Sequence, residues 1–411
     1  MTSMNFFILG NQPTLALAEI ASVVGKNHDY SLVTPEVLFL PDDDLNLSAL
    51  QERLGSVIKT GLLLGELPKW DQQELAQLIS AYSQEAPGKE KISFGISVYD
   101  VDKTTNNNEL HKQLQRLGLE TKKLLKETGR PIRYVSSKES VLSSVIVKTN
   151  QLLESGGEFV IFLFQNKVLV GQTVAVQNFE AWSERDYGRP ARDAKSGMLP
   201  PKLARTMINL AGIDPKEKIL LDPFCGSGTV LMEAVLLGCK EVIGSDISEK
   251  AMADTKKNMN WFSQNFLETR PNLLLFISPA QQLKEQYQTP VDLIITETYL
   301  GPPRKGKESE NSLKEKMQEI ETLVKDSLIE LKDLLKNDGV MVFAFPLYLT
   351  DNKPIALPLK KLFDQLGFEV LNPIPESSKQ LCLSLSPSGG IIYQREHQFI
   401  GREIIVFKKK Y

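Results

Sequence analysis

The sequence predicts an α/β domain with a mostly parallel sheet, preceded by two smaller α+β domains. From residue 202 onward, short apolar runs alternate with amphipathic helical patterns, which is typical of a parallel sheet covered by helices on both faces. The first 178 residues contain strand-like and helix-like segments in a less regular order. With 411 residues, 42% of them hydrophobic and 24% charged, the chain is long enough for two or three soluble domains.

The most informative segment of the chain is residues 218–247. An apolar strand ends at Asp222, a turn with Gly226 and Gly228 follows, and a helical pattern then leads to a second strand that ends at Asp246. This order is typical of a Rossmann-like nucleotide-binding unit. Its glycines let the backbone approach a ligand, and its second acidic residue can accept hydrogen bonds from ribose hydroxyls. The alternative is an unspecialised loop between a strand and a helix.

The turn reads Asp-Pro-Phe-Cys-Gly-Ser-Gly-Thr, which resembles the cofactor motif of class I methyltransferases that act on exocyclic amines of nucleobases. The resemblance implies S-adenosylmethionine as the cofactor, with Asp222 on its amino group, Asp246 on its ribose and Ile247 on its adenine. At Ser278 the family usually carries an acid, and a serine accepts a weaker bond. The cofactor-binding residues implied are Asp222, Pro223, Phe224, Gly226, Gly228, Thr229, Asp246, Ile247, Ser278 and Ala280.

The segment after the fourth predicted strand departs from that family. Amine methyltransferases of this group carry Asp/Asn-Pro-Pro-Tyr there, whereas this chain reads Thr-Glu-Thr-Tyr-Leu-Gly from Thr296. An exocyclic amine is a poor nucleophile because its lone pair is delocalised into the ring, so hydrogen-bond acceptors and a stacking ring must align it. We predict Glu297 as the catalytic acceptor and Tyr299 as the stacking residue. The alternative is a non-catalytic RNA-binding protein that retains the cofactor pocket.

The N-terminal half predicts two domains, residues 1–66 and 67–178. The first has the order strand, helix, strand, helix, strand, which suggests a ferredoxin-like domain. The second contains a long amphipathic helix over residues 110–128, followed by predicted strands that include residues 143–147.

Residues 89–139 are locally basic, with 11 Lys and Arg against 7 Asp and Glu. The sequences ISFGISV, KKLLKETGRPIRYV, SSVIVKTNQL and VLVGQTVAVQN resemble, in order and spacing, a THUMP domain, which is an RNA-binding module. On charge alone, the alternative is a solvated helix face. The RNA-binding residues that the resemblance implies are Lys122, Lys123, Lys126, Arg130, Arg133 and Lys138.

The remaining residues, 179–411, are predicted to be a linker and the Rossmann-like domain. Residues 181–212 contain Arg-Pro, Met-x-Pro, Leu-Ala-Arg and Asn-Leu elements, which resemble the segment before the catalytic core of the archaeal- and eukaryotic-type tRNA guanine-10 N2-methyltransferases. The resemblance implies methyl transfer to the N2 amine of a guanosine in tRNA. Another RNA base, in rRNA or an adenine amine, stays open as the target. Residues 304–316 are a lid near the target base or a plain solvated loop.

Composition limits the remaining function classes. The net charge of −3 gives no general attraction to nucleic acid, so any RNA-binding surface must be local. Three Cys at unrelated spacings and three distant His predict neither a disulfide framework nor a metal site. No apolar run approaches the roughly 18 residues of a membrane span, and the N-terminus lacks signal-peptide features. We therefore expect a cytoplasmic protein whose partner is tRNA or another structured RNA, as a monomer or a homodimer.

Overall fold

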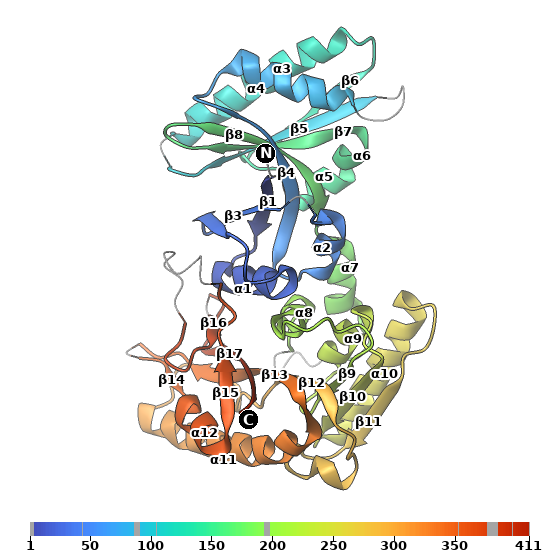
Figure 1. Cartoon of the computed structure of the whole chain (residues 1–411), viewed down its shortest axis with the longest axis vertical. Helices are drawn as coiled ribbons and strands as arrows, with labels where there is room; N and C mark the ends of the chain where they lie inside the picture. Colours follow the sequence, from blue (N-terminus) through green and yellow to red (C-terminus); the bar gives the residue numbers. More distant parts are fainter. Residues whose placement is uncertain are drawn as a thin grey trace. The chain divides into compact units, whose positions relative to one another are not determined.

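The structure is a computed structural model that describes residues 4–42, 44–85, 91–103, 105–192, 198–351, 353–375, 385–396 and 398–410 (Figure 1). It divides into two compact units, each described separately below. The first unit comprises residues 1–13, 28–52 and 57–179, and the second comprises residues 14–27, 53–56 and 180–411. The predicted boundary at 178/179 lies one residue from the last change of unit, whereas the boundary at 66/67 runs through the first unit.

The first unit is built on one eight-stranded sheet in the order β2-β3-β1-β4-β8-β7-β5-β6. Strands from both predicted N-terminal domains share this sheet, because β4 and β8 pair antiparallel along most of their length. The strands are β1 (Met4–Leu9), β2 (Ser31–Thr34), β3 (Val37–Pro41), β4 (Val57–Leu67), β5 (Ile92–Asp100), β6 (Ile132–Val135), β7 (Gly156–Leu163) and β8 (Val168–Val176). The helices that begin in this unit are α2 (Leu47–Arg53), α3 (Gln72–Gln84), α4 (Asn107–Lys126), α5 (Ser144–Thr149), α6 (Leu152–Ser155) and α7 (Phe179–Ser183).

A buried polar network lies where the two halves of this sheet meet. The Lys59 Nζ on β4 donates to the Glu158 carboxylate on β7 at 2.5 Å, and both side chains are essentially inaccessible to solvent. Ser97 and Thr173 donate hydroxyl hydrogen bonds to the same carboxylate at 2.6 and 2.8 Å. The lysine also donates to the Leu142 carbonyl, so the buried charges are paired and further hydrogen-bonded.

The strand predicted over residues 143–147 is wrong, because these residues belong to helix α5. The hydroxyl of Ser143 accepts a hydrogen bond from the Ile146 N–H at 3.3 Å, which is an N-cap interaction. Val147 points into a small apolar cluster with Leu142 and Leu152. The apolar β-branched residues that indicated a strand therefore form one short, capped helix that buries a single face.

The second unit contains the predicted parallel sheet. Its strand order is β11-β10-β9-β12-β13-β17-β15, with β17 antiparallel to both of its neighbours. The strands are β9 (Ile219–Asp222), β10 (Glu241–Asp246), β11 (Leu273–Ile277), β12 (Val291–Glu297), β13 (Leu335–Tyr348), β14 (Ile355–Ala356), β15 (Phe368–Leu371), β16 (Ile391–Tyr393) and β17 (Ile400–Lys409). The helices are α1 (Pro13–Val24), η1 (Glu184–Gly188), α8 (Pro201–Leu210), α9 (Thr229–Leu236), α10 (Glu249–Phe266), η2 (Ala280–Glu285), α11 (Glu310–Leu334) and α12 (Leu359–Leu366).

Successive residues of the central strands alternate between two cores on opposite faces of this sheet. Leu220 and Leu293 pack with side chains of α8, α9 and α10, whereas Leu221 and Ile294 pack with side chains of α11 and α12. Figure 1 shows α11 and α12 together on one side of the sheet. This arrangement explains why the strands read as continuous apolar runs, because both of their faces are buried. The prediction of an α/β domain with a mostly parallel sheet is confirmed.

Helix α1 belongs to the second unit although it is near the N-terminus. The buried Glu19 carboxylate accepts hydrogen bonds from the Gly55 N–H at 2.8 Å and from the Asn209 amide at 2.7 Å.

Among the helices of the described ranges, none combines the length and the hydropathy that a membrane span needs. The same ranges contain no group of three or more His, Cys, Asp or Glu residues placed to hold a metal ion.

Candidate active site

Three acidic residues lie at one edge of the parallel sheet. Asp222, Asp246 and Glu297 end strands β9, β10 and β12, and these strands run parallel. The chain order reverses between β9 and β12, which are neighbours in the sheet. Such a switch point opens a crevice at the carboxyl ends of the strands, where ligands of open α/β sheets bind. The structure therefore brings together the residues predicted for the cofactor and for the acceptor.

Asp222 is the most buried of these acids. Its carboxylate accepts hydrogen bonds from the Thr296 hydroxyl at 2.5 Å and from the Phe224 N–H at 3.2 Å. Burial nevertheless raises the pKa of Asp222 to about 7, since desolvation outweighs both hydrogen bonds and the nearby Asp246 and Glu297 add repulsion. A carboxylate in this environment gains most from a ligand that brings a positive charge.

The glycine turn after β9 keeps its backbone open to a ligand. Gly226 has a φ of +52°, and a side chain there would meet no atom within 4 Å. Its N–H donates to the Asp246 carboxylate at 3.0 Å, which fixes the acid beside the turn. Gly228 has a φ of +86°, and it begins helix α9 in a conformation that favours glycine. Both glycines are thus required for reasons of backbone conformation or access.

The other cofactor residues predicted from the sequence differ in exposure. Ile247 is 72% exposed, and Ile277, which was not predicted, is 54% exposed at the end of the neighbouring strand β11. Ile277 pairs with Asp246 across the two strands, and Ile247 follows Asp246 directly in the chain. Ser278 is buried, and its N–H donates to the Asp246 carbonyl at 3.1 Å. Pro223 and Ala280 are also buried, and Phe224 is half-buried.

Thr229 is engaged by the linker. Its hydroxyl accepts a hydrogen bond from the buried Arg189 guanidinium at 2.6 Å. The Asn258 amide on α10 donates to the carbonyls of Ala191 and Ser227, each at 2.9 Å, and accepts from the Ala191 N–H. The linker and the glycine turn are therefore joined by two side chains. The Arg-Pro element was recognised in the sequence, but no pattern indicated Asn258.

Two arginines of the linker segment share one buried carboxylate. Glu233 on α9 pairs with Arg185 at 2.6 Å and with Arg205 at 2.7 Å. Both guanidinium groups also lie over the Trp182 ring, at 4.3 and 5.0 Å from its centroid. These cations are thus neutralised inside the unit. Arg185 and Arg205 therefore have a structural role in this segment.

Glu297 makes an ion pair that the sequence did not predict. The Arg402 Nε on β17 donates to the Glu297 carboxylate at 2.5 Å, and both side chains are mostly buried. Burial raises the pKa of Glu297, because desolvation outweighs the opposing charge and hydrogen bond of Arg402. The arginine thus favours the ionised form of this acid and leaves the second carboxylate oxygen for another donor.

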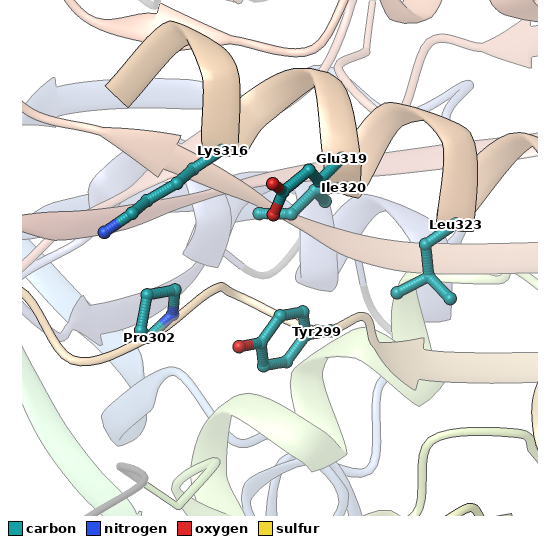
Figure 2. Close-up of a pocket in the computed structure, with 6 residues that line it drawn as sticks. All are labelled: Tyr299, Pro302, Lys316, Glu319, Ile320 and Leu323. Carbon is teal, nitrogen blue, oxygen red and sulfur yellow. The ribbon is translucent and has the colours of Figure 1, made fainter. Parts of the chain in front are cut away.

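Tyr299 follows Glu297 and is 51% exposed. Figure 2 shows its ring on a loop that faces helix α11 across a hollow. This hollow, which we call the α11 hollow, has a volume of about 350 Å³ and is lined by Tyr299, Pro302, Lys316, Glu319, Ile320 and Leu323. Thr298, between the acid and the tyrosine, is buried and donates its N–H to the Ala344 carbonyl at 3.1 Å.

The run after this loop is anchored at its first residue. The Arg304 guanidinium donates to the carbonyls of Leu349 and Phe399 at 2.8 and 2.7 Å. It lies over the rings of Tyr348 and Phe399, and it pairs with Glu308 at 3.6 Å. The polar run predicted over residues 304–316 is thus held in place at Arg304, and its residues from Glu310 onward belong to helix α11.

Replacing Gly301 by alanine is expected to disturb the loop that carries Tyr299. Gly301 has a φ of +88°, and a methyl group there would overlap the Tyr348 hydroxyl. We expect a loss of about 2 to 4 kcal/mol in unfolding free energy, from backbone strain and steric overlap together. Urea denaturation of Gly301→Ala measures it. Adding Tyr348→Phe removes the overlapping oxygen and should recover part of the loss; no recovery would contradict the steric explanation.

The six basic residues predicted to contact RNA lie in the first unit, on or just after α4. Lys123, Lys126, Arg133 and Lys138 are exposed, and Lys122 and Arg130 are half-buried. The opposite face of α4 is apolar and packs against the sheet through Leu110, Leu114, Leu117 and Leu125. The helix therefore presents its charged face to solvent, which is what both the RNA-binding and the solvated-face interpretations require.

The chain resembles known methyltransferases. The family described as RMKL-like, methyltransferase domain matches residues 189–347. A tRNA (guanine(10)-N2)-dimethyltransferase of Methanothermobacter thermautotrophicus is 30% identical over 188 residues, which cover 46% of this chain and 50% of that protein. A probable tRNA (guanine(10)-N2)-dimethyltransferase of Methanothermococcus thermolithotrophicus is 33% identical over 146 residues, which cover 35% of this chain and 78% of that protein. The chain belongs to the tRNA (guanine(10)-N2)-dimethyltransferase family.

The sequence similarity to these relatives covers only part of the chain. The chain spans about half the length of the first two curated relatives that it matches, 50% and 48%. The crystal structure of TrmN from Thermus thermophilus shares the fold, with a TM-score of 0.52, 16% identity and 99% of each chain covered. The chain thus shares sequence with part of the curated relatives, whereas it shares the fold of TrmN over almost its whole length.

The cofactor of this methyltransferase family fits the residues at the sheet edge. S-adenosylmethionine carries an ammonium group, two ribose hydroxyls and an adenine ring. Asp222 is a buried acid that lacks a counter-charge among its described contacts, and Asp246 lies beside the open backbone of Gly226. Ile247 and Ile277 offer two exposed apolar side chains to a flat ring. The residues present therefore match the chemistry of each part of the cofactor.

Proposed function

We propose that this protein transfers a methyl group from S-adenosylmethionine to the exocyclic N2 amine of a guanosine in tRNA. The observation that carries the proposal is the placement of Asp222, Asp246 and Glu297 along one sheet edge in a member of the tRNA (guanine(10)-N2)-dimethyltransferase family. Two of these acids match the cofactor, and the third remains for the acceptor. The names of the relatives supply the RNA class and the base.

The first half of the site holds the cofactor. Asp222 accepts from the cofactor's ammonium group, and Asp246 accepts from its ribose hydroxyls. Ile247 and Ile277 cover its adenine, and the backbone of Gly226 and Gly228 leaves room for it. Bound S-adenosylmethionine supplies an electrophilic methyl group, and the protein's part is to orient the nucleophile toward it.

The second half of the site orients the target amine. The free oxygen of Glu297 accepts an N–H of the amine, which turns the nitrogen lone pair toward the methyl group. The ion pair with Arg402 opposes protonation of this acid, and a protonated carboxyl would offer a donor where an acceptor is needed. Tyr299 stacks on a base that has been moved out of its helix. As the new N–C bond forms, the bond between the methyl carbon and the cofactor's sulfur breaks to leave a neutral thioether, and the amine releases one proton to solvent.

The first unit binds the RNA in this proposal. Residues 67–178 act as a THUMP-like module after a ferredoxin-like domain at residues 1–66, and residues 179–411 perform catalysis. The six basic residues on and just after α4 contact phosphates, which gives affinity without base readout. Modification of tRNA fits the cytoplasmic location expected from the sequence, and the protein works as a monomer or a homodimer.

A second candidate function is RNA binding without methyl transfer. The departure from Asp/Asn-Pro-Pro-Tyr and the ion pair between Glu297 and Arg402 favour it. Incubation of unmodified tRNA with S-adenosylmethionine carrying a labelled methyl group, followed by nucleoside analysis, tests both functions. We expect labelled N2-methylguanosine. Label in another nucleoside would redirect the target. No label in any RNA, with cofactor binding retained by calorimetry, would favour the second candidate.

A further inference from the structure

The α11 hollow lies close to the acceptor acid in sequence, because Tyr299, which lines it, is two residues after Glu297. One wall is the loop with Tyr299 and Pro302, and the other wall is the exposed side of α11. Its volume of about 350 Å³ is at the lower end of the range for ligand pockets, roughly 300–1,000 Å³. The hollow is thus of a size for one flat heterocycle rather than for a longer ligand.

The apolar lining suits a flat ring. Figure 2 shows the Tyr299 ring opposite Ile320 and Glu319, with Leu323 at one end and Pro302 toward the other. An aromatic ring stacks on one face of a nucleobase, and stacking is worth about 1 to 3 kcal/mol per base in proteins that bind single strands. Ile320 is buried, so this wall is fixed by the packing of α11 against the sheet.

The polar lining carries information about which base fits. Lys316 and Glu319 are three residues apart on α11, so their side chains project from one face of the helix. A carboxylate only accepts hydrogen bonds, and an ammonium group only donates them. The hollow therefore offers an acceptor pair from Glu319, across from the Tyr299 ring, and a donor from Lys316, which extends toward the Pro302 end (Figure 2).

Guanine alone among the four RNA bases can offer two adjacent donors to the carboxylate and still offer an acceptor to the ammonium group. Its Watson–Crick edge presents two adjacent donors, N1–H and N2–H, followed by the O6 acceptor. Adenine presents an N1 acceptor beside its amine, and cytosine presents N3 and O2 acceptors beside its amine, so a carboxylate meets a lone pair in both. Uracil offers one donor between two acceptors.

We propose that Glu319 and Lys316 of the α11 hollow select guanine as the target base. Glu319 accepts from N1–H and from one N2–H, and Lys316 donates to O6. The inference rests on the proposed function. It assigns the choice of base to helix α11, and not to the segment Thr-Glu-Thr-Tyr-Leu-Gly at residues 296–301. These residues determine specificity; they do not perform the transfer.

A modified base separates this assignment from methyl transfer itself. 2,6-Diaminopurine retains the N2 amine but has a bare N1 acceptor and a 6-amino donor in place of O6. We compare kcat/KM for tRNA carrying guanosine or 2,6-diaminopurine at the position found by nucleoside analysis. Wild type should prefer guanosine by about 10- to 100-fold, the effect of unpaired polar groups in a binding site.

The Glu319→Gln variant should reduce this preference. Its amide can donate to the N1 acceptor, so kcat/KM for guanosine should fall about 10-fold or more while the value for 2,6-diaminopurine falls less or rises. Lys316→Met should likewise lower the ratio of kcat/KM for guanosine to that for 2,6-diaminopurine, because it removes the donor to O6. Glu315→Gln, which changes an exposed α11 residue outside the hollow, is the matched control and should leave the ratio unchanged.

The outcomes are distinguishable. If wild type labels no guanosine in any RNA, the proposed function itself fails. If wild type labels guanosine but Glu319→Gln and Lys316→Met keep the wild-type ratio, the assignment of these residues is overturned. Calorimetric cofactor binding and circular dichroism establish that each variant is folded with its cofactor site intact, so a changed ratio reports on base selection.

Discussion

Asp222→Asn is expected to stabilise the cofactor-free protein at pH 8 and to weaken cofactor binding about 100-fold. Because burial raises the pKa of Asp222 from 3.8 to about 7, the unfolded chain releases this proton at lower pH than the folded protein does. Stability therefore falls as pH rises from about 4 to 7, by up to about 4 kcal/mol. Asparagine removes that loss but leaves amide hydrogens to satisfy, so the expected net gain is about 1 to 3 kcal/mol.

Urea denaturation at pH 8 and pH 4, with calorimetry at pH 8, measures the two effects of Asp222→Asn. The stability gain should largely vanish at pH 4, where the acid is neutral in the folded protein and only about half ionised in the unfolded chain. The matched variant Thr296→Val keeps the carboxylate but removes its 2.5 Å hydrogen bond. Thr296→Val should raise the pKa of Asp222 further. Cofactor binding should then need a higher pH to reach full strength. Wild-type affinity in Asp222→Asn would contradict the role given to this acid.

Replacing Arg402 by glutamine is expected to shift the pH dependence of methyl transfer. Without the guanidinium, burial alone acts on Glu297, so the pKa of this acid rises and its acceptor form is lost over a higher pH range. We expect kcat to fall at least about 100-fold at pH 7, with partial recovery as the pH is raised. A rate profile from pH 6 to 9 measures the shift.

The stability of Arg402→Gln should have its own pH dependence. Breaking a buried ion pair costs about 3 to 5 kcal/mol when the remaining charge stays ionised. Since the folded pKa of Glu297, already raised by burial, rises further without the arginine, the loss should be small below pH 5 and grow toward pH 8. Arg402→Lys keeps a charge near the acid and should lie between glutamine and wild type. Equal rate profiles for all three proteins would show that Glu297 is not the acceptor.

The sequence predicted those features whose determinants are local. The segment from β9 to β10 was predicted because its strand periodicity, glycine turn and terminal acids lie within 30 consecutive residues. The alternation of strands and helices likewise predicted the parallel sheet. The short helix α5 was missed, because a β-branched apolar run favours a strand unless the cap at Ser143 is weighed.

Pairings between distant residues could not be predicted. Glu297 and Arg402 are 105 residues apart, and they meet only because β17 inserts beside β13. Asn258 joins the linker to the glycine turn from the middle of an amphipathic helix, where an asparagine carries no distinguishing pattern. Likewise, no pattern indicated that Glu233 neutralises Arg185 and Arg205 in the interior.

The buried lysine of strand β4 makes the two N-terminal domains of the sequence inseparable. Residues 67–178 expressed without the preceding residues would retain Glu158 in an apolar interior but lose Lys59, its counter-charge. They would also expose the whole length of β8, which β4 covers in the intact chain, as an unpaired edge. The region that we propose to bind RNA is therefore not a portable module: it can be transplanted or studied alone only if the chain from β1 onward goes with it.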